Sequence, residues 1–592
     1  MPQLTAPAGP SNPPSPSANV PTAPPPNPFP PQGWTRYVGI NEVHGLAWAQ
    51  DGTLWTATAG GVAHWNVHTE TYVQYTEDDG LPSGHANDVA LAPDGSVWAA
   101  MLGGVSHLAG NTWTSCTVGD GIADASVQSI AVSPDGDVWV GTLSGVSRFG
   151  EGSWTSYLAG VRAWKVAVAP DGFVWAANDG AGVSYYSPKE DSWTTLGAEQ
   201  GLPNGGVKTV AVAPDGSIWI YIGYDQVYRY DGDNWQAVQG IAAPWVLDMA
   251  FDAAGSAWIA TGPGLHGRGH GLLAPAGDAW TQVTAEQGLG SDTVYAVALG
   301  PDGTVAAGTT LGVSLYHDGQ WRTLRGGPTR NRVTSVAVTP DGAVWLGFGD
   351  YSAYRAGGGV ARFDGVEWSY FLGDQNVTVL AVDPQGTLWA GAGYGLTRWD
   401  GSAWSEAGGG CDALMGDVLD VAFGPDGSAW VASGMNLGRF DGAAWTIYDR
   451  LASSVAVSLD GAVWISAWKG TQGSDYTARF DGSTWVEYAG SRASPAVASD
   501  GQVWAVAQDG DPACFDGQGW PACPDAEEVD LDARECLIMR PDGSLWAAGQ
   551  AGLVRLELDE WQVHPGAIAC APDGSLWLGT SNGVVRWLPD AE

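Results

Sequence analysis

The chain has 592 residues and carries 24 Lys and Arg against 64 Asp and Glu, a formal net charge of −40. This charge argues against nucleic acid as the main partner, because a polyanion must be met by basic side chains, and equally against an anionic membrane surface. No apolar run reaches the roughly 18 residues that a membrane span needs. The most unusual feature of the composition is 33 Trp alongside 86 Gly, and internal repeats account for it.

Residues 1–33 form a separate region that contains 13 of the 36 prolines. Such a segment lacks the backbone donors that a sheet needs and favours an extended, polyproline-like conformation, so we expect a disordered tether. It has neither the basic start nor the apolar core of a signal peptide. A tether that follows a signal or lipid anchor is one interpretation, and an ordinary disordered tail of a cytosolic protein is the other.

From Val43 onward the sequence repeats a unit of about 40 residues, a period typical of propeller blades. Each of the fourteen copies contains a P-D-G element or its equivalent. Its central residue, here called the turn position, is residue 51, 94, 135, 171, 215, 254, 302, 341, 385, 426, 460, 500, 542 or 573. Four residues later stands a Trp in every copy except the one with Ala306, and a second Trp follows in nearly every copy.

Each copy contains four short β-type segments joined by tight turns, which predicts an all-β fold of fourteen four-stranded β-propeller blades. The paired Trp side chains suit packing between blades. Because propellers usually close with four to eight blades, we expect two seven-bladed rings. A single fourteen-bladed ring is the alternative, and it would leave an unusually wide hole.

The last copy ends after three strands, and the missing fourth strand is found at the other end of the chain as GWTRYV around Trp34. We therefore expect residues 34–42 to close the last blade, which removes open sheet edges. The first ring would then span residues 43–328 and the second residues 329–592. The chain would cross between rings near Val38–Glu42 and again near Arg325–Arg332.

The linkers between several copies carry a further pattern, as in TEDDGLPSGHANDVALAPDGSVWAA at residues 76–100 and GAEQGLPNGGVKTVAVAPDGSIWI at residues 197–220. Together with W-x-G-T and G-V-x-R-F elements, this pattern resembles the two-component regulator propeller repeat. The resemblance covers about residues 34–588 and implies the extracytoplasmic sensing part of a bacterial signalling system, commonly built as two seven-bladed rings. The D-G-x-x-W blades are also similar to those of streptogramin lyases, a more distant enzymatic interpretation.

No nucleophile elbow, zinc-protease motif, phosphate loop or C-x-x-C pair occurs, so no catalytic residue, metal centre or cofactor is expected. Most Asp residues lie in turns, where they accept local hydrogen bonds. His64 with His68, and His266 with His270, have a helical metal-ligand spacing in a strand or loop context. The acidic stretch Asp525–Asp532 could hold Ca²⁺, with a solvated loop as the alternative.

Cys514 and Cys523 flank one predicted hairpin in CFDGQGWPAC. Their strands should lie side by side, so we expect a disulfide between them. Such a bond would indicate an oxidising compartment, in agreement with a secreted, periplasmic or cell-surface location.

Ligand sites of propellers usually lie on the face that carries the linkers between blades. The residue seven before each turn position, here called the mouth position, should enter the inner strand on that face. In the first ring these residues are His44, Asn87, Gln128, Trp164, Lys208, Leu247 and Tyr295, and in the second they are Thr334, Thr378, Leu419, Ser453, Ala493, Glu535 and Gly566. The first set mixes polar and aromatic groups, as small-molecule sites do, and Trp245 adds another aromatic ring. We predict a ligand site there, with solvent-exposed rim residues as the alternative.

A second group of aromatic residues falls in predicted loops between second and third strands: Tyr221, Tyr224, Tyr351, Tyr354, Tyr394, Trp468 and Tyr476. Exposed aromatic rings suit sugars and also protein partners, whereas packing within the blade is the structural alternative.

These observations favour a non-catalytic propeller that binds or senses a small molecule or glycan, or a protein on its loop face. A propeller enzyme, either a lyase or a glycan-cleaving hydrolase, is the first alternative, with His44, Lys208 and Tyr295 as its acid/base candidates. A structural scaffold protein is the second.

Overall fold

The computed structural model describes most of the chain from Trp34 onward. The described residues are 34–180, 182–223, 226–241, 245–263, 269–277, 279–330, 332–349, 358–373, 375–392, 395–407, 414, 416–467, 476–489, 495–497, 503–506, 512–521, 536–539, 545–549, 552–555, 568–571, 575–580 and 583–587. They form twelve four-stranded and two three-stranded antiparallel sheets, so the expected all-β propeller architecture is present. No helix among them is long and apolar enough to cross a membrane.

The first seven sheets, here called the N-terminal sheets, each use four consecutive strands. They are β2 (Val43–Trp48), β3 (Leu54–Thr58), β4 (Gly61–Asn66) and β5 (Thr71–Tyr75); β6 (Ala86–Leu91), β7 (Val97–Met101), β8 (Gly104–Ala109) and β9 (Thr112–Cys116); β10 (Val127–Val132), β11 (Val138–Thr142), β12 (Gly145–Gly150) and β13 (Ser153–Tyr157); β14 (Ala163–Val168), β15 (Val174–Asn178), β16 (Gly182–Ser187) and β17 (Ser192–Leu196); β18 (Val207–Val212), β19 (Ile218–Ile222), β20 (Gln226–Tyr230) and β21 (Trp235–Ala237); β22 (Val246–Phe251), β23 (Ala257–Thr261), β24 (Leu272–Ala276) and β25 (Ala279–Val283); β26 (Val294–Leu299), β27 (Val305–Thr309), β28 (Gly312–His317) and β29 (Gln320–Leu324).

The remaining seven are the C-terminal sheets. They are β30 (Ser335–Val338), β31 (Val344–Phe348), β32 (Gly359–Phe363) and β33 (Trp368–Phe371); β34 (Val377–Val382), β35 (Leu388–Ala392), β36 (Gly395–Trp399) and β37 (Trp404–Glu406); β38 (Asp420–Phe423), β39 (Ala429–Ala432), β40 (Leu437–Phe440) and β41 (Trp445–Tyr448); β42 (Ser454–Val457), β43 (Val463–Ala467), β44 (Tyr476–Phe480) and β45 (Trp485–Ala489); β46 (Ala496–Val497), β47 (Val503–Val506) and β48 (Pro512–Cys514); β49 (Cys536–Met539), β50 (Leu545–Gly549) and β51 (Gly552–Arg555); β52 (Ile568–Cys570), β53 (Leu576–Thr580) and β54 (Gly583–Trp587), joined by β1 (Trp34–Tyr37). The two three-stranded sheets adjoin residues 522–535 and 556–567, which lie outside the described ranges.

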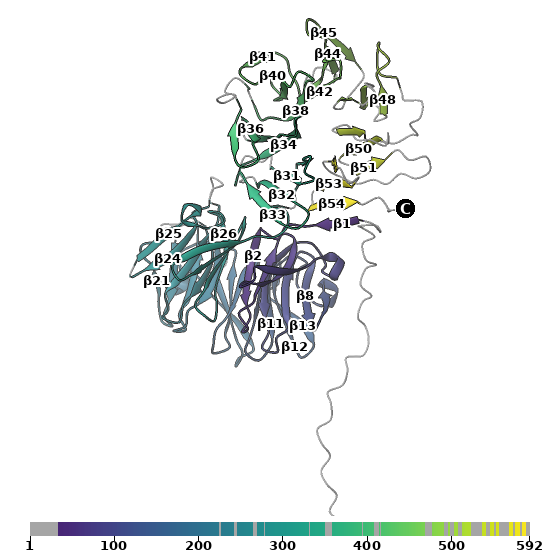
Figure 1. The fold of residues 1–592 in the computed structure, drawn as a ribbon. Coiled ribbons are helices and arrows are strands. Elements are labelled where there is room, and N and C mark those ends of the chain that lie inside the picture. The colour runs from purple at the N-terminus through teal and green to yellow at the C-terminus, as the bar shows by residue number, and fades with distance from the viewer. Residues whose placement is uncertain are drawn as a thin grey trace, which may run out of the picture.

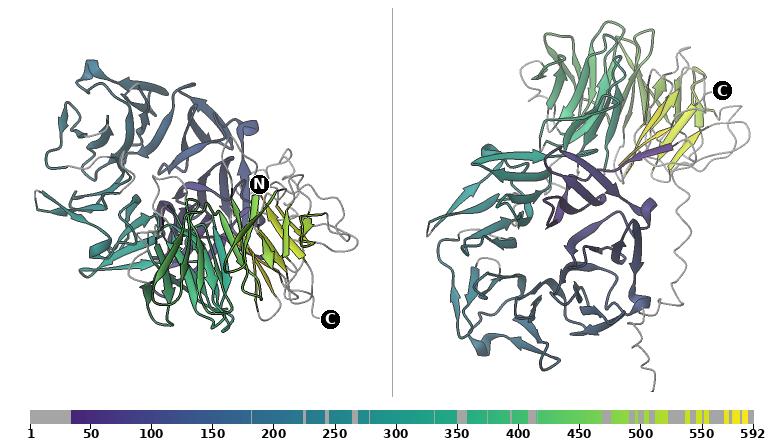
Figure 2. Two further views of the ribbon diagram at one scale, coloured as in Figure 1. Left: turned by 90° about the horizontal axis from the view of Figure 1, so that it is seen from above. Right: turned by 60° about the horizontal axis from the view of Figure 1, so that its bottom comes forward.

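The inner, first strands of neighbouring sheets contact one another. Among the N-terminal sheets the contacts run from β2 through β6, β10, β14, β18, β22 and β26 and return to β2. Among the C-terminal sheets, β30 contacts both β34 and β52. The N-terminal sheets lie around a common centre (Figure 2), and the C-terminal sheets form a second group beside them (Figure 1).

The strand expected to complete the last sheet is present. β1 pairs antiparallel with β54, with Trp34 opposite Trp587 and Tyr37 opposite Val584, and Figure 1 shows β1 crossing to that sheet. The ring of Tyr37 stacks on Trp577 with centroids 5.5 Å apart. The last sheet therefore joins the two ends of the chain.

The two chain crossings predicted from sequence lie side by side. The buried amide of Asn41 donates to the carbonyl oxygens of Gly326 (3.0 Å) and Pro328 (2.9 Å) and accepts from the Gly326 N–H (2.9 Å). Nearby, the Tyr370 hydroxyl donates to the Gly327 carbonyl at 2.9 Å. These bonds join the segment before the N-terminal sheets to the segment that leaves them.

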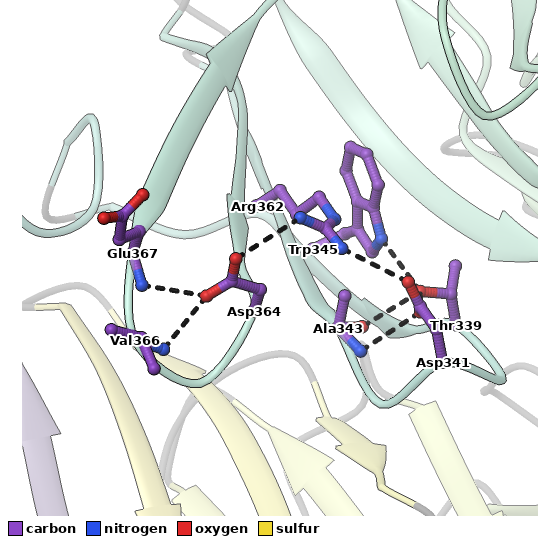
Figure 3. Close-up of polar contacts among 8 residues, drawn as sticks. All are labelled: Thr339, Asp341, Ala343, Trp345, Arg362, Asp364, Val366 and Glu367. Carbon is purple, nitrogen blue, oxygen red and sulfur yellow. Dashed lines mark hydrogen bonds and ion pairs between the residues drawn. The ribbon is translucent and has the colours of Figure 1, made fainter.

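The P-D-G elements have the structural role expected for their Asp residues. At Asp341, one carboxylate oxygen accepts bonds from the Thr339 hydroxyl and the Ala343 N–H, and the other faces the Arg362 guanidinium at 3.2 Å (Figure 3). The same Arg362 lies 5.7 Å above the ring of Trp345. Turn Asp, Arg and Trp thus form one stacked unit that ties the first turn of a sheet to its third strand.

The G-L-P linkers also have a physical explanation. Four 3₁₀ helices, η1 (Glu77–Asp79), η2 (Val118–Asp120), η3 (Ala198–Gln200) and η4 (Ala285–Gln287), connect an outer strand to the next inner strand. η1 ends at Gly80 with φ of 102°, a left-handed conformation that favours glycine. The following Leu81 is buried among the Trp side chains of two sheets, so the linker anchors one sheet on the next.

Candidate functional site

All seven mouth positions of the N-terminal sheets are β-bulges. In each inner strand the register against the second strand shifts across this residue, for example between Val127 and Ser129 around Gln128, and between Ala163 and Lys165 around Trp164. The same shift occurs around His44, Asn87, Lys208, Leu247 and Tyr295. A bulge leaves its residue outside the ladder and re-aims its side chain, and bulges are common beside active sites.

One cluster of aromatic and acidic side chains forms where the first sheet meets its two neighbours. The His44 ring lies with its centroid 4.8 Å from that of His85 and 4.8 Å from that of Tyr295. The Glu42 carboxylate lies 3.9 Å from His44 Nε2 and accepts a 3.5 Å bond from the Tyr295 hydroxyl. Burial lowers the pKa of His85, and its Nε2 contacts Asn87 Oδ1 at 3.1 Å. Neutral imidazole, carboxylate and phenol groups therefore meet at one place.

A second cluster surrounds Trp164. The Arg162 guanidinium lies 5.1 Å and the Lys208 ammonium 4.7 Å from the centroid of the Trp164 ring, distances typical of cation–π contacts. Both cations also pair with Asp179, at 3.3 and 3.2 Å. The buried indole N–H of Trp164 has no hydrogen-bond acceptor among the residues that the structure describes. The cluster thus holds two cations, one carboxylate and one unused donor.

The remaining predicted residues differ in character. The Gln128 amide donates to the Ser126 hydroxyl at 3.0 Å, whereas Leu247 contributes an apolar side chain. Trp245 has φ of 66°, which is strained for a bulky residue, and its N–H donates to the Tyr221 hydroxyl at 2.8 Å. The strained Trp245 lies just before β22, beside the bulge at Leu247.

A charged triad that the sequence did not predict lies on the inner strands, one residue after the mouth position. Lys165 Nζ lies 3.3 Å from Asp88 Oδ2 and 3.4 Å from Asp248 Oδ1, joining three alternate sheets. Burial raises the pKa of Asp88, which the Lys165 ammonium partly offsets. The two carboxylates raise the pKa of Lys165 even though burial opposes the rise. A sequence signal for this triad exists. Asp88, Lys165 and Asp248 each stand six residues before a turn position, whereas the neighbouring copies have the uncharged Ser129 and Thr209 there.

This inter-sheet position, six residues before the turn position, also joins adjacent sheets. Its side chain accepts the backbone N–H of the next inner strand: Asp88 from Ile130, Ser129 from Val166, Asp248 from Val297, Ser335 from Leu380 and Asp420 from Val455. At Gly45 a Cβ would lie 2.6 Å from Asp88 Oδ1, so a glycine there leaves room for that carboxylate.

A cavity of about 380 Å³ opens between three of the inner strands, and Lys165 and Asp248 are its charged lining residues. Most of its wall comes from β14, β18 and β22, including Met249 and Phe251. Its size is within the roughly 300–1,000 Å³ range of small-molecule sites. The charged triad therefore lies between the predicted mouth and this cavity.

The hydroxyl-bearing mouth positions of the C-terminal sheets bond to backbone carbonyls, as the Asn87 amide does to the Val127 carbonyl at 2.7 Å in the N-terminal sheets. The Thr334 hydroxyl donates to the carbonyls of Gly347 and Val377, and the Thr378 hydroxyl to those of Gly391 and Val418. Ser453 donates to the carbonyl of Ser466 at 3.0 Å, and Leu419 is apolar. Ala493, Glu535 and Gly566 lie outside the described residues. The described hydroxyls of this set are engaged in backbone contacts within and between sheets.

The predicted loop aromatics require correction where they can be observed. Tyr221 lies inside β19 and is 1% exposed, and Tyr476 begins β44 and is 7% exposed. Both are packed in the sheets, because the second and third strands extend further than the sequence pattern indicated. Tyr224, Tyr351, Tyr354, Tyr394 and Trp468 lie outside the described residues.

Cys514 is disulfide-bonded, and its expected partner Cys523 lies outside the described residues. His64 stacks on Trp55 with centroids 4.1 Å apart, a packing role. No cluster of three metal-ligating side chains occurs within the described ranges, which do not include His266 or Asp525–Asp532.

No family model and no curated protein matches the sequence. Among solved structures, the chain is similar to PorZ, a bacterial surface component of the type-IX secretion system of Porphyromonas gingivalis, with a TM-score of 0.66 and 15% identity over 94% of this chain and 87% of that one. It is also similar to a GH74 enzyme of Niastella koreensis, with a TM-score of 0.62 and 15% identity over 95% of this chain and 100% of that one. At this identity both similarities concern the fold alone.

A third match is an extracellular domain, BT3049, assigned to a hybrid two-component system of B. thetaiotaomicron. Its TM-score is 0.39, with 15% identity over 94% of this chain and 83% of that one. That score is too low to carry an argument about fold or function.

Proposed function

We propose that this chain is a non-catalytic, ligand-binding or sensing protein built from two seven-bladed propellers, and that its ligand binds at the mouth of the N-terminal propeller. The circuit of contacts from β2 through β26 and back to β2 supports the first ring. The pairing of β1 with β54, and the contact of β30 with β52, support the second.

One observation carries the location of the ligand site. The bulged mouth positions of the N-terminal sheets hold His44, Trp164, Lys208 and Tyr295, none of which is a component of the repeat's turn, Trp or linker elements. Keeping large polar and aromatic groups beside an axis has a desolvation cost unless they are solvated or bound. The same positions in the C-terminal sheets hold small hydroxyls that bond to backbone carbonyls, so folding of a blade does not require the larger groups.

The polar groups at the N-terminal mouth define the kind of ligand. Arg162 and Lys208 offer cationic donors around Trp164, whereas Glu42 offers a carboxylate acceptor and His44 and His85 offer imidazole rings about the first sheet. A small polar molecule with both an acidic and a hydroxyl or amino function would match these two clusters. Its charged end would replace part of the Asp179 pairing.

An extracytoplasmic location forms part of this proposal. The disulfide at Cys514 supports it, because disulfides persist in oxidising compartments. The resemblance of the repeats to those of extracytoplasmic sensors agrees with it.

A thermal-shift screen of sugars, amino acids and organic acids on the full chain tests the proposal, since a ligand that binds the folded form raises the midpoint. Hits are then titrated against Trp164→Ala and Lys208→Met. We expect each change to weaken binding by about 1–3 kcal/mol, as for anchor residues. Thr334→Ala, at the matched position of the other propeller, should leave the affinity unchanged. Affinity that responds to Thr334 but ignores both N-terminal changes would contradict the proposal.

A lyase or hydrolase is the second candidate, because Glu42, His44, His85 and Tyr295 lie within contact of one another and could transfer protons. The structure does not bring Lys208 into this group, since Lys208 pairs with Asp179. Turnover of a screening hit that is lost in His44→Ala and kept in Trp164→Ala would favour the enzyme. Binding without turnover favours the sensor.

A further inference from the structure

One N-terminal sheet departs from the repeat on the face that carries the P-D-G turns. In most registers of the described strands, the residue opposite the first Trp of a copy is Arg or His, as in Trp139 opposite Arg148 and Trp219 opposite Arg229. Two described copies differ: Cys514 lies opposite Trp504 among the C-terminal sheets, and Tyr185, an aromatic residue, lies opposite Trp175. The stacked unit of turn Asp, Arg and Trp is therefore absent from this sheet and replaced by an aromatic pair.

The same copy departs from the repeat a second time. Two residues after the turn position, the other thirteen copies have Ser, Thr, Asp, Ala or Gln, whereas this copy has Phe173. Phe173 packs on Tyr185 with ring centroids 5.7 Å apart, and Tyr185 lies 5.1 Å from Trp175. Two departures that place aromatic rings together in one sheet are not required for building a blade, since the other copies fold without them.

A cavity of about 410 Å³ opens at this place, between the fourth sheet and the fifth. One wall is aromatic, formed by Phe173, Tyr185 and Tyr230, and all three rings are partly exposed. Burial raises the pKa of Tyr230, and its hydroxyl donates to the Gly232 carbonyl at 2.6 Å. The Tyr230 ring is thus held in one orientation by its own hydroxyl.

The rim of this cavity is polar. Asp215 and Arg229 form a 2.6 Å ion pair, and their side chains are 55% and 44% exposed. Asp171 and Asp231 complete the rim. Hydrogen bonds from Ser217 lower the pKa of Asp215, and the backbone N–H groups of Asn234 and Asp233 lower that of Asp231. Both carboxylates are therefore ionised acceptors at neutral pH, with a guanidinium donor between them.

We propose that this aromatic groove is a second binding site, for a neutral hexopyranose oligosaccharide. The apolar C–H face of a pyranose ring would stack on Phe173 and Tyr185, and its hydroxyl groups would donate to Asp215 and Asp231 and accept from Arg229. The three rim carboxylates disfavour an acidic sugar, because Arg229 is the one cation among the described residues that line the groove and Asp215 already pairs with it. The site lies at the turn end of the inner strands, opposite the mouth, and does not depend on the ligand proposed there.

The test is isothermal titration of the full chain with cellotetraose, mannotetraose and maltotetraose as neutral probes and with trigalacturonate as the acidic probe. We expect at least one neutral probe to bind, and trigalacturonate to bind at least tenfold more weakly. The double variant Phe173→Ser with Tyr185→Arg restores the residues that the repeat uses elsewhere, so the blade should fold with an unchanged midpoint. It should weaken neutral binding at least tenfold.

His107→Arg is the matched control, because it places an Arg at the same repeat position, opposite Trp98 in the second sheet, away from the groove. It should leave neutral binding unchanged. Three results would overturn the proposal: no heat with any neutral probe, equal binding of the acidic probe, or neutral binding that survives the double variant. Binding of a lysine-rich peptide in place of the sugars would also overturn it, since that result assigns the groove to a cationic protein segment.

Discussion

The N-terminal and C-terminal sheets share the same turns and Trp residues and differ at two positions of the inner strand. At the mouth position most N-terminal sheets have large polar or aromatic residues, of which Asn87 donates to the Val127 carbonyl, whereas three of the described C-terminal sheets have Thr334, Thr378 and Ser453 bonded to backbone carbonyls. At the inter-sheet position the N-terminal sheets hold the triad Asp88–Lys165–Asp248. The difference shows which inner-strand groups a blade needs and which it carries in addition.

The carboxylates at the inter-sheet position also differ between the N-terminal and C-terminal sheets. Asp88 and Asp420 each accept the backbone N–H of the next inner strand, but only Asp88 has a cation partner within the described residues. Burial raises the pKa of Asp420 to about 6. The same hydrogen bond is therefore built with a counter-ion in one group of sheets and without one in the other.

The largest expected effect concerns closure, since only the C-terminal sheets take a strand from the other end of the chain. Deleting residues 1–37 removes β1, exposes the edge of β54 and removes the Tyr37 ring from Trp577. We expect a loss of about 3–5 kcal/mol in the C-terminal unfolding transition, comparable to large core truncations. Calorimetry should show a lower midpoint for that transition and an unchanged one for the N-terminal sheets.

Deletion of residues 1–31 is the matched control, because it keeps β1 and removes most of the proline-rich segment. It should melt as the full chain does. Equal melting of both truncations would show that β1 contributes little to the last sheet.

The second effect concerns the N-terminal sheets. Lys165→Met leaves the buried Asp88 and the largely covered Asp248 without their cation, and removing one member of such a group costs roughly 3–5 kcal/mol. Denaturant unfolding at pH 7 should show this loss, whereas Lys189→Met, at an exposed lysine, should change stability by less than about 0.5 kcal/mol.

Adding Asp88→Ser and Asp248→Ser to Lys165→Met should recover most of that stability. Ser129 makes the same inter-sheet bond with a hydroxyl, to Val166 N at 3.0 Å, so Ser can keep the bond without the charge. A triple variant that is no more stable than Lys165→Met alone would argue against an electrostatic origin of the loss.

The sequence predicted the features that repeat and missed those that occur once. Fourteen copies of P-D-G and Trp are enough to predict the sheets, the linkers and the strand around Trp34, because one packing rule applies to every copy. Tyr221 was misplaced because a strand end depends on the length of one particular loop. Lys165 was missed because its meaning depends on Asp88 and Asp248, which lie two sheets away on either side and which no local pattern connects.

A smaller effect distinguishes Asp420, which has no cation partner among the described residues, from the paired Asp88. It is the pH dependence of the unfolding free energy. The folded pKa of Asp420, about 6, lies above the ordinary Asp value of 3.8 because of burial, so the folded state binds the proton more tightly than the unfolded state. The contribution of Asp420 to stability is therefore full below pH 4 and is lost as pH rises to about 6, by about 1–3 kcal/mol. Asp420→Ser keeps an acceptor for Val455 and should remove this loss.

The measurement is the difference in unfolding free energy between Asp420→Ser and the parent at pH 4 and at pH 7. We expect the variant to gain stability relative to the parent as pH rises. A difference that is constant across this range would mean that Asp420 titrates near its ordinary value.

The smallest expected effect tests the contrast at the mouth position itself. Thr378→Val keeps the shape of the side chain and removes the hydroxyl that donates to Gly391 and Val418, so it should cost about 0.5–1.5 kcal/mol. Gln128→Ala, at the matched position of an N-terminal sheet, removes an amide that bonds locally to Ser126 and should stay within about 0.5 kcal/mol. Both changes in unfolding free energy are measured by denaturant unfolding of the full chain. Each is taken from the transition that includes the sheet carrying the substitution. If Gln128→Ala costs as much as Thr378→Val, the N-terminal mouth residues hold the blades together, and the argument that they are free to serve a ligand fails.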